Sequence, residues 1–319
     1  MSMAIMCSGG DAPGMNPAIK RFVDYVYLKG EKPYFIYNGL EGLIDNDIRL
    51  AKHRDVSGIL HKGGAIIGSS RSKRFFKKRY RKRAYKNLQK NGIDSLVVLG
   101  GDGSFRAMDV FSKEFDINFM GIPSTIDNDI AYNDYCLGVD TALNVIRDAS
   151  DKIRDTASTF KRGFVIEIMG RECGYLCAAS AISCGAELCL IPEVDLDLKL
   201  AKKILQKEIK SGRNYVLCFV AEGTKKSDFM VEWIEKHLGL ETRKSVLGYI
   251  QRGGNPTTYD RLMAFEYIVK AVNHLLIKKD INKVIIHKKG GFGVKSIDKV
   301  VNGRYSIDGN ILNMLNFIG

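Results

Sequence analysis

The sequence predicts an α/β fold of doubly wound, mainly parallel-sheet lobes. Short runs rich in Val, Ile and Leu alternate with amphipathic helical segments from end to end, which is typical of a parallel sheet covered by helices on both faces. The chain has 319 residues, 45% of them hydrophobic, and is near the size at which one core divides into two. We therefore expect two lobes.

The predicted strands are apolar runs of four to six residues, bounded by polar or turn-forming residues. They are Met3–Cys7, Pro33–Tyr37, Ser95–Leu99, Asn118–Ile122, Phe164–Ile168, Leu188–Ile191, Tyr215–Val220 and Lys283–His287. Between them lie segments whose apolar residues recur at the spacing of one helical face. The predicted helices are Met15–Lys29, Arg74–Lys90, Ser104–Phe115, Asp140–Thr156, Gly174–Cys184, Leu198–Lys210, Asp228–His237 and Tyr259–Leu276.

Three strand ends carry glycine and aspartate in a pattern that suits phosphate. They are the segments Ser8–Asn16, Gly100–Ser104 and Gly121–Asp129. A glycine loop before a helix brings backbone N–H groups to a phosphate, and a single acid there can face Mg²⁺. Loops at the carboxyl ends of parallel strands are also where α/β proteins place reactive groups. Together the three loops predict a nucleotide kinase-like site.

The third loop places two carboxylates, Asp127 and Asp129, two residues apart after a buried strand. Such a pair suits a general base beside an acid that orients a metal. The alternative is an ordinary turn rich in Asp and Asn. The two other loops favour the chemical interpretation.

The formal net charge is +13, and nine cations fall within Arg71–Arg83. A nucleic-acid-binding surface is one interpretation of this run. We favour a solvated helix face whose first arginines contact an anionic substrate, in a field that steers anionic substrates inward. Nucleic acid is therefore not expected as a partner.

Composition also bears on the cellular compartment. The seven cysteines include no Cys-x-x-Cys pair and lie mostly in apolar runs, as buried thiols do. Cys173 and Cys177 have helical spacing, but no nearby histidine or thiol completes a zinc site. No run is long enough to span a membrane, and the N-terminus lacks the pattern of a leader. We expect a cytoplasmic protein without a membrane partner.

The three loops, in this order and spacing, resemble the bacterial-type ATP-dependent 6-phosphofructokinase family. A Gly-Gly-Asp-Gly-Ser loop alone also resembles NAD kinases and diacylglycerol kinases, but those lack the segment Thr125–Asp129. Further segments resemble the family along nearly the whole chain. They are Gly68–Arg71, Arg154–Thr156, Met169–Arg171, Ile191–Val194, Ala221–Gly223 and Leu247–Gly254.

The resemblance implies phosphoryl transfer from MgATP to the 1-hydroxyl of fructose 6-phosphate, giving fructose 1,6-bisphosphate and ADP in glycolysis. It implies that Asp127 is the base and that Asp129, Thr125 and Asn128 hold this base and the metal in place. It also implies that Arg171 balances the negative charge that develops on the transferred phosphoryl group. The implied metal ligand is Asp102, which binds Mg²⁺ directly or through water. The implied nucleotide-binding residues are Gly10, Arg71, Gly101, Gly103 and Ser104.

The implied fructose 6-phosphate residues are Arg162, Met169, Glu222, Arg243, Tyr249 and Arg252. In the family, Arg162 and Arg243 reach across from a neighbouring subunit, which implies a homotetramer with shared active sites. The resemblance also implies a nucleotide-binding lobe of residues 1–138 plus 251–302 and a sugar-phosphate-binding lobe of 139–250 plus 303–319, with the active site between them.

Two residues depart from the family pattern. Tyr249 stands where a histidine usually contacts the sugar phosphate, so we expect a weaker sugar site. Ser124 stands where ATP users have glycine and pyrophosphate users have lysine. Gly103 favours ATP, because pyrophosphate users typically have aspartate there. The alternatives are a pyrophosphate-dependent enzyme and a non-catalytic regulatory paralogue that binds sugar phosphate or nucleic acid.

Overall fold

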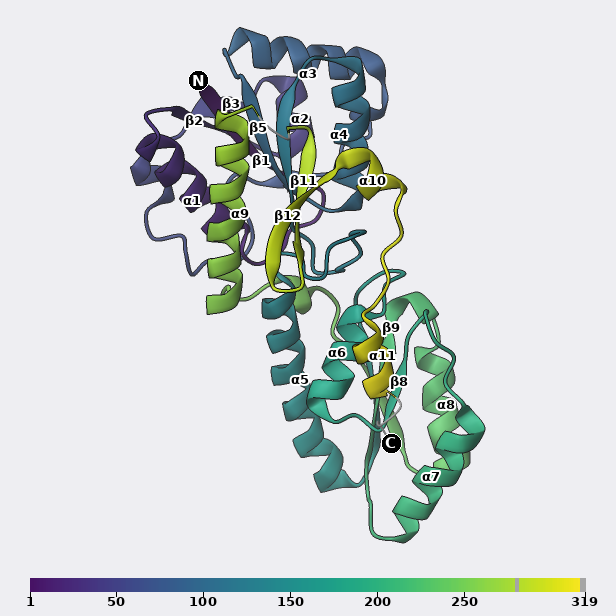
Figure 1. Cartoon of the computed structure of the whole chain (residues 1–319). Helices are drawn as coiled ribbons and strands as arrows, with labels where there is room; N and C mark the ends of the chain where they lie inside the picture. The colour runs from purple at the N-terminus through teal and green to yellow at the C-terminus, as the bar shows by residue number, and fades with distance from the viewer. Residues whose placement is uncertain (279–280, 316–319) are drawn as a thin grey trace. The chain divides into compact units, whose positions relative to one another are not determined.

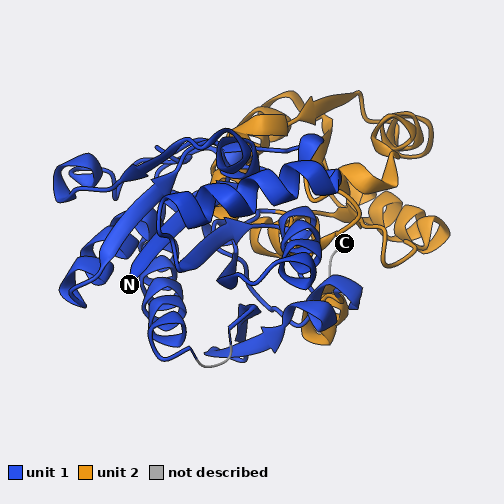
Figure 2. Cartoon of the chain, turned by 90° about the horizontal axis from the view of Figure 1, so that it is seen from above, with its two compact units in different colours: residues 1–126, 130–141, 252–305 blue, residues 127–129, 142–251, 306–319 orange. Residues whose placement is uncertain are grey.

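The computed structural model describes residues 1–278 and 281–315, which form two compact units (Figure 2). Unit 1 comprises residues 1–126, 130–141 and 252–305, and unit 2 comprises residues 127–129, 142–251 and 306–319. Residues 279–280 of the first predicted lobe and 316–319 of the predicted C-terminal tail lie outside the described residues.

Unit 1 is built on an eight-stranded sheet. Its strands are β1 (Ser2–Ser8), β2 (Lys32–Ile36), β3 (Ile48–Leu50), β4 (Ser69–Ser70), β5 (Ser95–Gly100), β6 (Asn118–Pro123), β11 (Lys283–Lys288) and β12 (Gly291–Ser296). Their order is β12-β11-β6-β5-β1-β2-β3, with β4 paired to β1. The pairings are parallel except at the two edges, where β3 and β12 are antiparallel to their neighbours. β5 is buried along its whole length, as expected for a central strand of a covered sheet.

Helices cover both faces of this sheet, with α1 and α9 on one side and α3 and α4 on the other (Figure 1). The helices of unit 1 are α1 (Met15–Leu28), α2 (Gly39–Asp45), α3 (Lys78–Lys90), α4 (Asp102–Glu114), α9 (Thr258–Leu276) and α10 (Ile297–Asn302), with 3₁₀ turns at His53–Val56 and Arg74–Phe76. The unit is therefore doubly wound.

Unit 2 has a four-stranded parallel sheet in the order β10-β7-β9-β8. Its strands are β7 (Gly163–Ile168), β8 (Leu188–Leu190), β9 (Val216–Ala221) and β10 (Thr242–Val246). Its helices are α5 (Val139–Phe160), which begins in unit 1, α6 (Tyr175–Cys184), α7 (Leu198–Lys210), α8 (Ser227–Leu238) and α11 (Gly309–Leu315), with 3₁₀ turns at Glu222–Thr224 and Gly248–Arg252.

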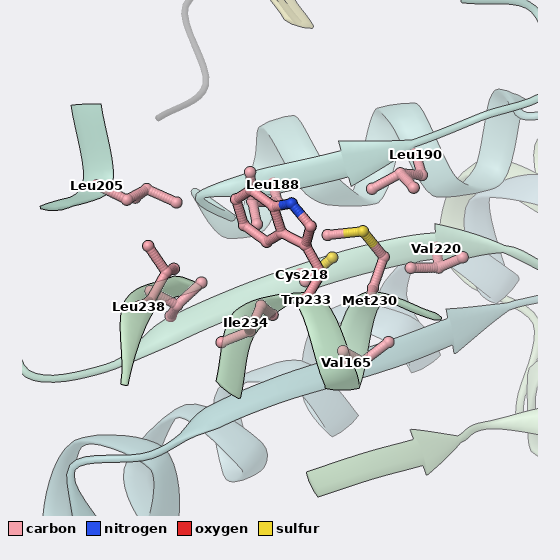
Figure 3. Close-up of a cluster of buried hydrophobic side chains, with 11 residues drawn as sticks. Val165, Leu188, Leu190, Leu205, Cys218, Val220, Met230, Trp233, Ile234 and Leu238 are labelled. Atoms are coloured by element: carbon pink, nitrogen blue, oxygen red, sulfur yellow. The ribbon is translucent and has the colours of Figure 1, made fainter. Parts of the chain in front are cut away.

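The core of unit 2 lies between its sheet and the helices α7 and α8. Trp233, Ile234 and Met230 of α8 pack there on Cys218 and Val220 of β9 (Figure 3). Burial of apolar side chains of this size stabilises the unit by about 1.5–3 kcal/mol each.

The α/β fold class predicted from the sequence is confirmed, and each predicted strand and helix has a counterpart. The predicted helix Arg74–Lys90 is wrong in its first turn. There, a 3₁₀ turn ends at Lys77, whose backbone is extended, and α3 begins at Lys78. Phe75 fixes this turn by packing edge-to-face on Phe111 with ring centroids 5.2 Å apart.

Two further sequence expectations concern the thiols and the membrane. All seven cysteines are free, and Cys189 is the one that is not fully buried. Among the described residues, no helix is both long and apolar enough to cross a membrane.

Candidate active site

The carboxyl ends of β1, β5 and β6 lie side by side, because these strands are parallel neighbours in unit 1. In the strand register, Ser8 is opposite Gly100, and Gly100 is opposite Pro123. The Ser104 hydroxyl donates to the Ser8 carbonyl oxygen over 2.8 Å, and the Ser124 amide donates to the Gly100 carbonyl oxygen over 2.9 Å. The loops predicted to bind phosphate therefore begin at one edge of the sheet.

The predicted nucleotide-binding glycines differ in the room around them. A Cβ atom on Gly103 would meet no atom within 4 Å, whereas one on Gly101 would lie 3.5 Å from Cβ of Thr125. A Cβ atom on Gly10 would lie 3.1 Å from Nη1 of Arg252. Arg252, predicted among the sugar-phosphate residues, thus lies in unit 1 beside the loop that follows β1.

Asp102, the predicted metal ligand, is the first residue of α4, and its Oδ2 accepts a 2.7 Å hydrogen bond from Nε of Arg106. No group of three or more His, Cys, Asp or Glu side chains is placed to hold a metal within residues 1–278 and 281–315. Mg²⁺ commonly binds through one or two carboxylates, keeping water and substrate phosphates as its other ligands. A single carboxylate at the start of a helix therefore fits Mg²⁺ held together with a nucleotide.

Arg71 follows β4, which pairs with the end of β1. Its side chain is exposed, and none of the ion pairs between described residues includes it. This guanidinium is thus available to an anion near the first glycine loop.

Asp127 and Arg171 form the central ion pair of unit 2. Nε of Arg171 lies 3.1 Å from Oδ2 of Asp127, whose side chain is 3% exposed, while Arg171 is 46% exposed. Asn128 follows with its backbone in the left-handed region (φ 53°), as Asn tolerates in tight turns. The site thus has a buried carboxylate whose cationic partner extends into solvent.

The loop after β7 that carries Arg171 is held by Glu222. Oε1 of Glu222 accepts hydrogen bonds from the amides of Gly170 (3.1 Å) and Arg171 (2.7 Å). A Cβ atom on the next residue, Gly223, would lie 2.1 Å from the Arg171 carbonyl oxygen, so glycine is required there for this close approach. Gln251 supports the same loop, since its Oε1 accepts from the Met169 amide over 3.1 Å.

A second set of contacts joins the Asp127 loop to the start of α6. The thiol of Cys173 donates to the Asn128 carbonyl oxygen over 3.8 Å, and the amide of Gly174 donates to Oε1 of Glu193 over 2.9 Å. Burial, with smaller effects from nearby acids that include Asp129 and Asp127, raises the pKa of the Cys173 thiol to about 12. Cys173 is therefore a neutral donor that helps to fix this loop.

Arg162 and Arg243 lie at the opposite end of β7. Nε of Arg162 is 2.7 Å from Oε2 of Glu241, and Nη2 of Arg243 pairs with the other oxygen of the same carboxylate. Arg162 directly precedes β7, and Arg243 is aligned with Phe164 near its amino end. At about 3.3 Å per residue, the length of β7 separates them by roughly 16 Å from the loop of Arg171.

Tyr249 is 81% exposed in the 3₁₀ turn Gly248–Arg252. Gln251 of that turn is fully buried, yet the sequence analysis gave it no role, although it quoted the surrounding motif. No role was predicted for Arg106 or for Glu193, although Glu193 lies in the quoted segment Ile191–Val194. The signal that could have identified Gln251 is its place as a polar residue inside the segment Leu247–Gly254, which resembles the family.

The family model described as phosphofructokinase matches residues 2–275. This chain belongs to the phosphofructokinase family. It is 55% identical over 316 residues to the ATP-dependent 6-phosphofructokinase of Sulfurimonas denitrificans, covering 98% of each chain. It is 53% identical over 291 residues to the ATP-dependent 6-phosphofructokinase of Wolinella succinogenes, covering 91% of each.

Among solved structures, phosphofructokinase from Saccharomyces cerevisiae is similar, with a TM-score of 0.87 and 31% identity. The match covers 94% of this chain and 45% of the yeast chain, so this chain spans less than half the length of that relative. The predicted family and enzyme class are confirmed by these comparisons.

Proposed function

We propose that this chain transfers the terminal phosphoryl group of ATP to the 1-hydroxyl of fructose 6-phosphate, with Asp127 as the base. The observation that carries the proposal is the 3.1 Å pair between buried Asp127 and half-exposed Arg171. A carboxylate buried beside one cation is positioned to accept a proton once that cation has another anion to contact. The transferred phosphoryl group is that anion.

The reaction then needs little covalent chemistry from the protein. Asp127 accepts the proton of the 1-hydroxyl, and Arg171 moves its contact toward the phosphoryl oxygens, where charge develops. Glu222 and Gln251 keep the loop of Arg171 in place during this exchange, because they bind its backbone. Thr125, Asn128 and Asp129 hold the base in position.

ATP and its metal are assigned to the glycine loops of unit 1. Gly10, Gly101, Gly103 and Ser104 line the phosphates, and Arg71 supplies a cation. Asp102 would hold Mg²⁺, which when bound neutralises charge on the phosphates and orients them. Nε of Arg106 donates a 2.7 Å hydrogen bond to the same carboxylate.

The residues at positions 103 and 124 favour ATP over pyrophosphate as the phosphoryl donor. The space around Gly103 is open, and the Ser124 hydroxyl donates within its own loop, to the Ile122 carbonyl oxygen over 3.3 Å. An acid at position 103 would fill that space with negative charge and repel the α-phosphate. Neither residue therefore obstructs a nucleotide.

The sugar phosphate is assigned to Met169, Glu222, Tyr249 and Arg252 of one subunit with Arg162 and Arg243 of a neighbour. The length of β7 between the two groups within one chain supports this division. We further propose a homotetramer with shared active sites that acts in the cytoplasm. Nucleotide then binds the lobe 1–138 plus 251–302, and the sugar phosphate binds the lobe 139–250 plus 303–319, with Arg252 as the one assigned residue from the first lobe.

A coupled assay of fructose 1,6-bisphosphate formation tests the proposal, with ATP or pyrophosphate as donor in the presence of Mg²⁺. We expect turnover with ATP and none with pyrophosphate. A preference for pyrophosphate would establish the alternative donor, and binding of fructose 6-phosphate without turnover would establish a non-catalytic paralogue.

A further inference from the structure

The basic stretch 71–90 has no role in the proposed reaction beyond Arg71. It holds eleven Lys and Arg residues and no acid, and no Asp or Glu occurs between Asp55 and Asp94. The rest of the chain has 38 Lys and Arg against 36 Asp and Glu. Nearly all of the net charge of +13 therefore resides in this one segment.

The arginines of the stretch that face the protein are compensated by acids of neighbouring elements. Nε of Arg74 donates a 2.6 Å hydrogen bond to Oε2 of Glu41, and Nη1 of the same guanidinium donates to Oδ1 of Asp45. Arg81 is buried and makes two 2.7 Å hydrogen bonds to Glu114. These acids are occupied by the arginines, and they stabilise the packing of the stretch on α2 and α4.

The outward face of α3 is different. Its exposed positions are Lys78, Arg79, Lys82, Arg83, Lys86, Gln89 and Lys90. Arg83 has a carboxylate at 3.8 Å, but among the described residues no acid lies within ion-pair distance of the lysines. Lys78, Lys82, Lys86 and Lys90 recur every four residues and form a ridge about 18 Å long.

One large apolar side chain lies at the start of this ridge. Phe76 is 82% exposed, because its neighbour Phe75 is buried against Phe111 and fixes the 3₁₀ turn. Lys73 and Lys77, both exposed, flank it. An aromatic side chain among cations gains from a partner that is anionic at its surface and apolar beneath.

We propose that the lysine ridge of α3 and Phe76 form a docking surface for a membrane rich in anionic phospholipid. The lysines would contact lipid phosphates, and Phe76 would enter the boundary between headgroups and acyl chains. Clusters of four to eight cations on one helix face are typical of such surfaces. This departs from the expectation of no membrane partner, which rested on the absence of a spanning segment and on treating the run as a solvated face.

Nucleic acid fits the same surface less well. Arg79, Arg83 and Gln89 on the outward face could contact base edges, but such contacts would leave the exposed ring of Phe76 without an apolar partner. A duplex would also leave Phe76 against phosphates, where burial of an aromatic ring gains nothing.

Vesicle co-sedimentation tests the proposal with full-length protein. The wild-type protein is expected to bind vesicles of phosphatidylcholine with 30% phosphatidylglycerol and to dissociate from them as the salt concentration is raised. It should not bind vesicles of phosphatidylcholine alone. Each cation near such a surface contributes about fivefold in affinity. Lys82→Glu/Lys86→Glu should therefore bind at least about 25-fold more weakly.

The matched control is Lys203→Glu/Lys207→Glu on α7, which changes the net charge equally at two exposed lysines four residues apart. It should bind within about threefold of wild type. If the two variants lose equal affinity for anionic vesicles, binding depends on net charge alone and the proposal is overturned. The proposal is also overturned if the wild-type protein does not bind anionic vesicles.

Phe76→Trp provides a second readout. The native protein has one tryptophan, Trp233, which is buried in the core of unit 2, so its emission is a fixed background. Anionic vesicles should shift the emission of the added tryptophan to shorter wavelength, and an unchanged emission would contradict insertion of position 76. A 20-nucleotide RNA bound more tightly than the vesicles, through Lys82 and Lys86, would reassign the surface to nucleic acid. All these readouts are independent of the catalytic assay.

Discussion

The two ends of β7 use carboxylates in different ways. At the carboxyl end, Glu222 binds two backbone amides of the loop that carries Arg171. At the amino end, the carboxylate of Glu241 pairs with the side chains of Arg162 and Arg243. Backbone hydrogen bonds fix where a loop lies, whereas an exposed ion pair contributes about 0–1 kcal/mol and is readily exchanged.

This difference suggests two kinds of functional residue. The proposed base, Asp127, and Arg171 are already paired in this structure, as catalysis by positioning requires. Arg162 and Arg243, at the amino end, pair with the Glu241 carboxylate, and a substrate phosphate can take the place of that carboxylate. The following predictions test whether that distinction is real.

The largest effect is expected from the fixed end. Asp127→Ser should lower kcat at least about 100-fold with KM for both substrates within about threefold, because a transition-state role is lost. Steady-state kinetics with ATP and fructose 6-phosphate measures this. A kcat within a few-fold of wild type would mean that Asp127 is not the base.

The exchangeable end should instead affect binding. Arg243→Ala should raise KM for fructose 6-phosphate about 10–100-fold and change kcat little, since a charge-assisted hydrogen bond to a phosphate is removed. Lys244→Ala is the matched control, because the next residue of β10 pairs with Asp228 instead. An equal KM for the two variants would contradict a phosphate-binding role.

Mixing the two defective proteins tests the shared site. If Arg243 serves the neighbouring subunit, hybrids of Arg243→Ala and Asp127→Ser chains contain sites with both residues intact, and activity should recover after subunits are exchanged. Without recovery in verified hybrids, both residues would belong to one chain's own site.

A smaller effect separates the two possible roles of Glu222. Glu222→Gln keeps an oxygen that can accept from both amides, so a residue that mainly positions the loop should leave kcat and KM within about threefold. Glu222→Ala should lower kcat about tenfold or more. If Glu222→Gln strongly raises KM for fructose 6-phosphate, the Glu222 carboxylate contacts the sugar itself.

The fold could be predicted from the sequence where elements are buried and periodic. β1, β5 and β6 are nearly continuous apolar runs, which parallel central strands produce. The missed strands lie at edges or are very short. β10, Thr242–Val246, has an exposed polar sequence, and β12 contains two glycines within Gly291–Ser296. Neither has the apolar pattern that identifies a strand.

Motifs predicted the candidate site residues, whose roles stay predictions, but not the contacts that hold these residues in place. The pairing of Glu241 with Arg162 spans 79 residues and that of Glu222 with the Arg171 amide spans 51, so nothing local specifies either partner. Gln251 is a further example, because its hydrogen bond to Met169 spans 82 residues.

A third carboxylate, that of Asp260 at the start of α9, accepts hydrogen bonds from backbone amides, as Glu222 does. It is fully buried in unit 1 and accepts from the amides of Gly138 and Thr141, both at 2.8 Å, at the first turn of α5. Burial, with a smaller contribution from Asp140, raises its pKa to about 6, although its hydrogen bonds act in the opposite direction. Asp260 therefore tests whether such a carboxylate acts through position alone.

The smallest effect on catalysis is expected from Asp260→Asn, which should change kcat at pH 7.5 by less than about threefold while altering the pH dependence of stability. Because the folded-state pKa lies above the ordinary value of 3.8, the stabilisation from this group is full below pH 3.8 and is lost as pH rises through about 6. The amide does not titrate, but it leaves one backbone N–H without an acceptor, at a cost of about 1–3 kcal/mol. The variant should thus melt below wild type at pH 5, and the gap in Tm should narrow by pH 7.5. Thermal unfolding of both proteins across this range measures the gap. A gap that is constant with pH would show that Asp260 has the same charge throughout, and a large loss of kcat at pH 7.5 would place the first turn of α5 among the elements that position the site.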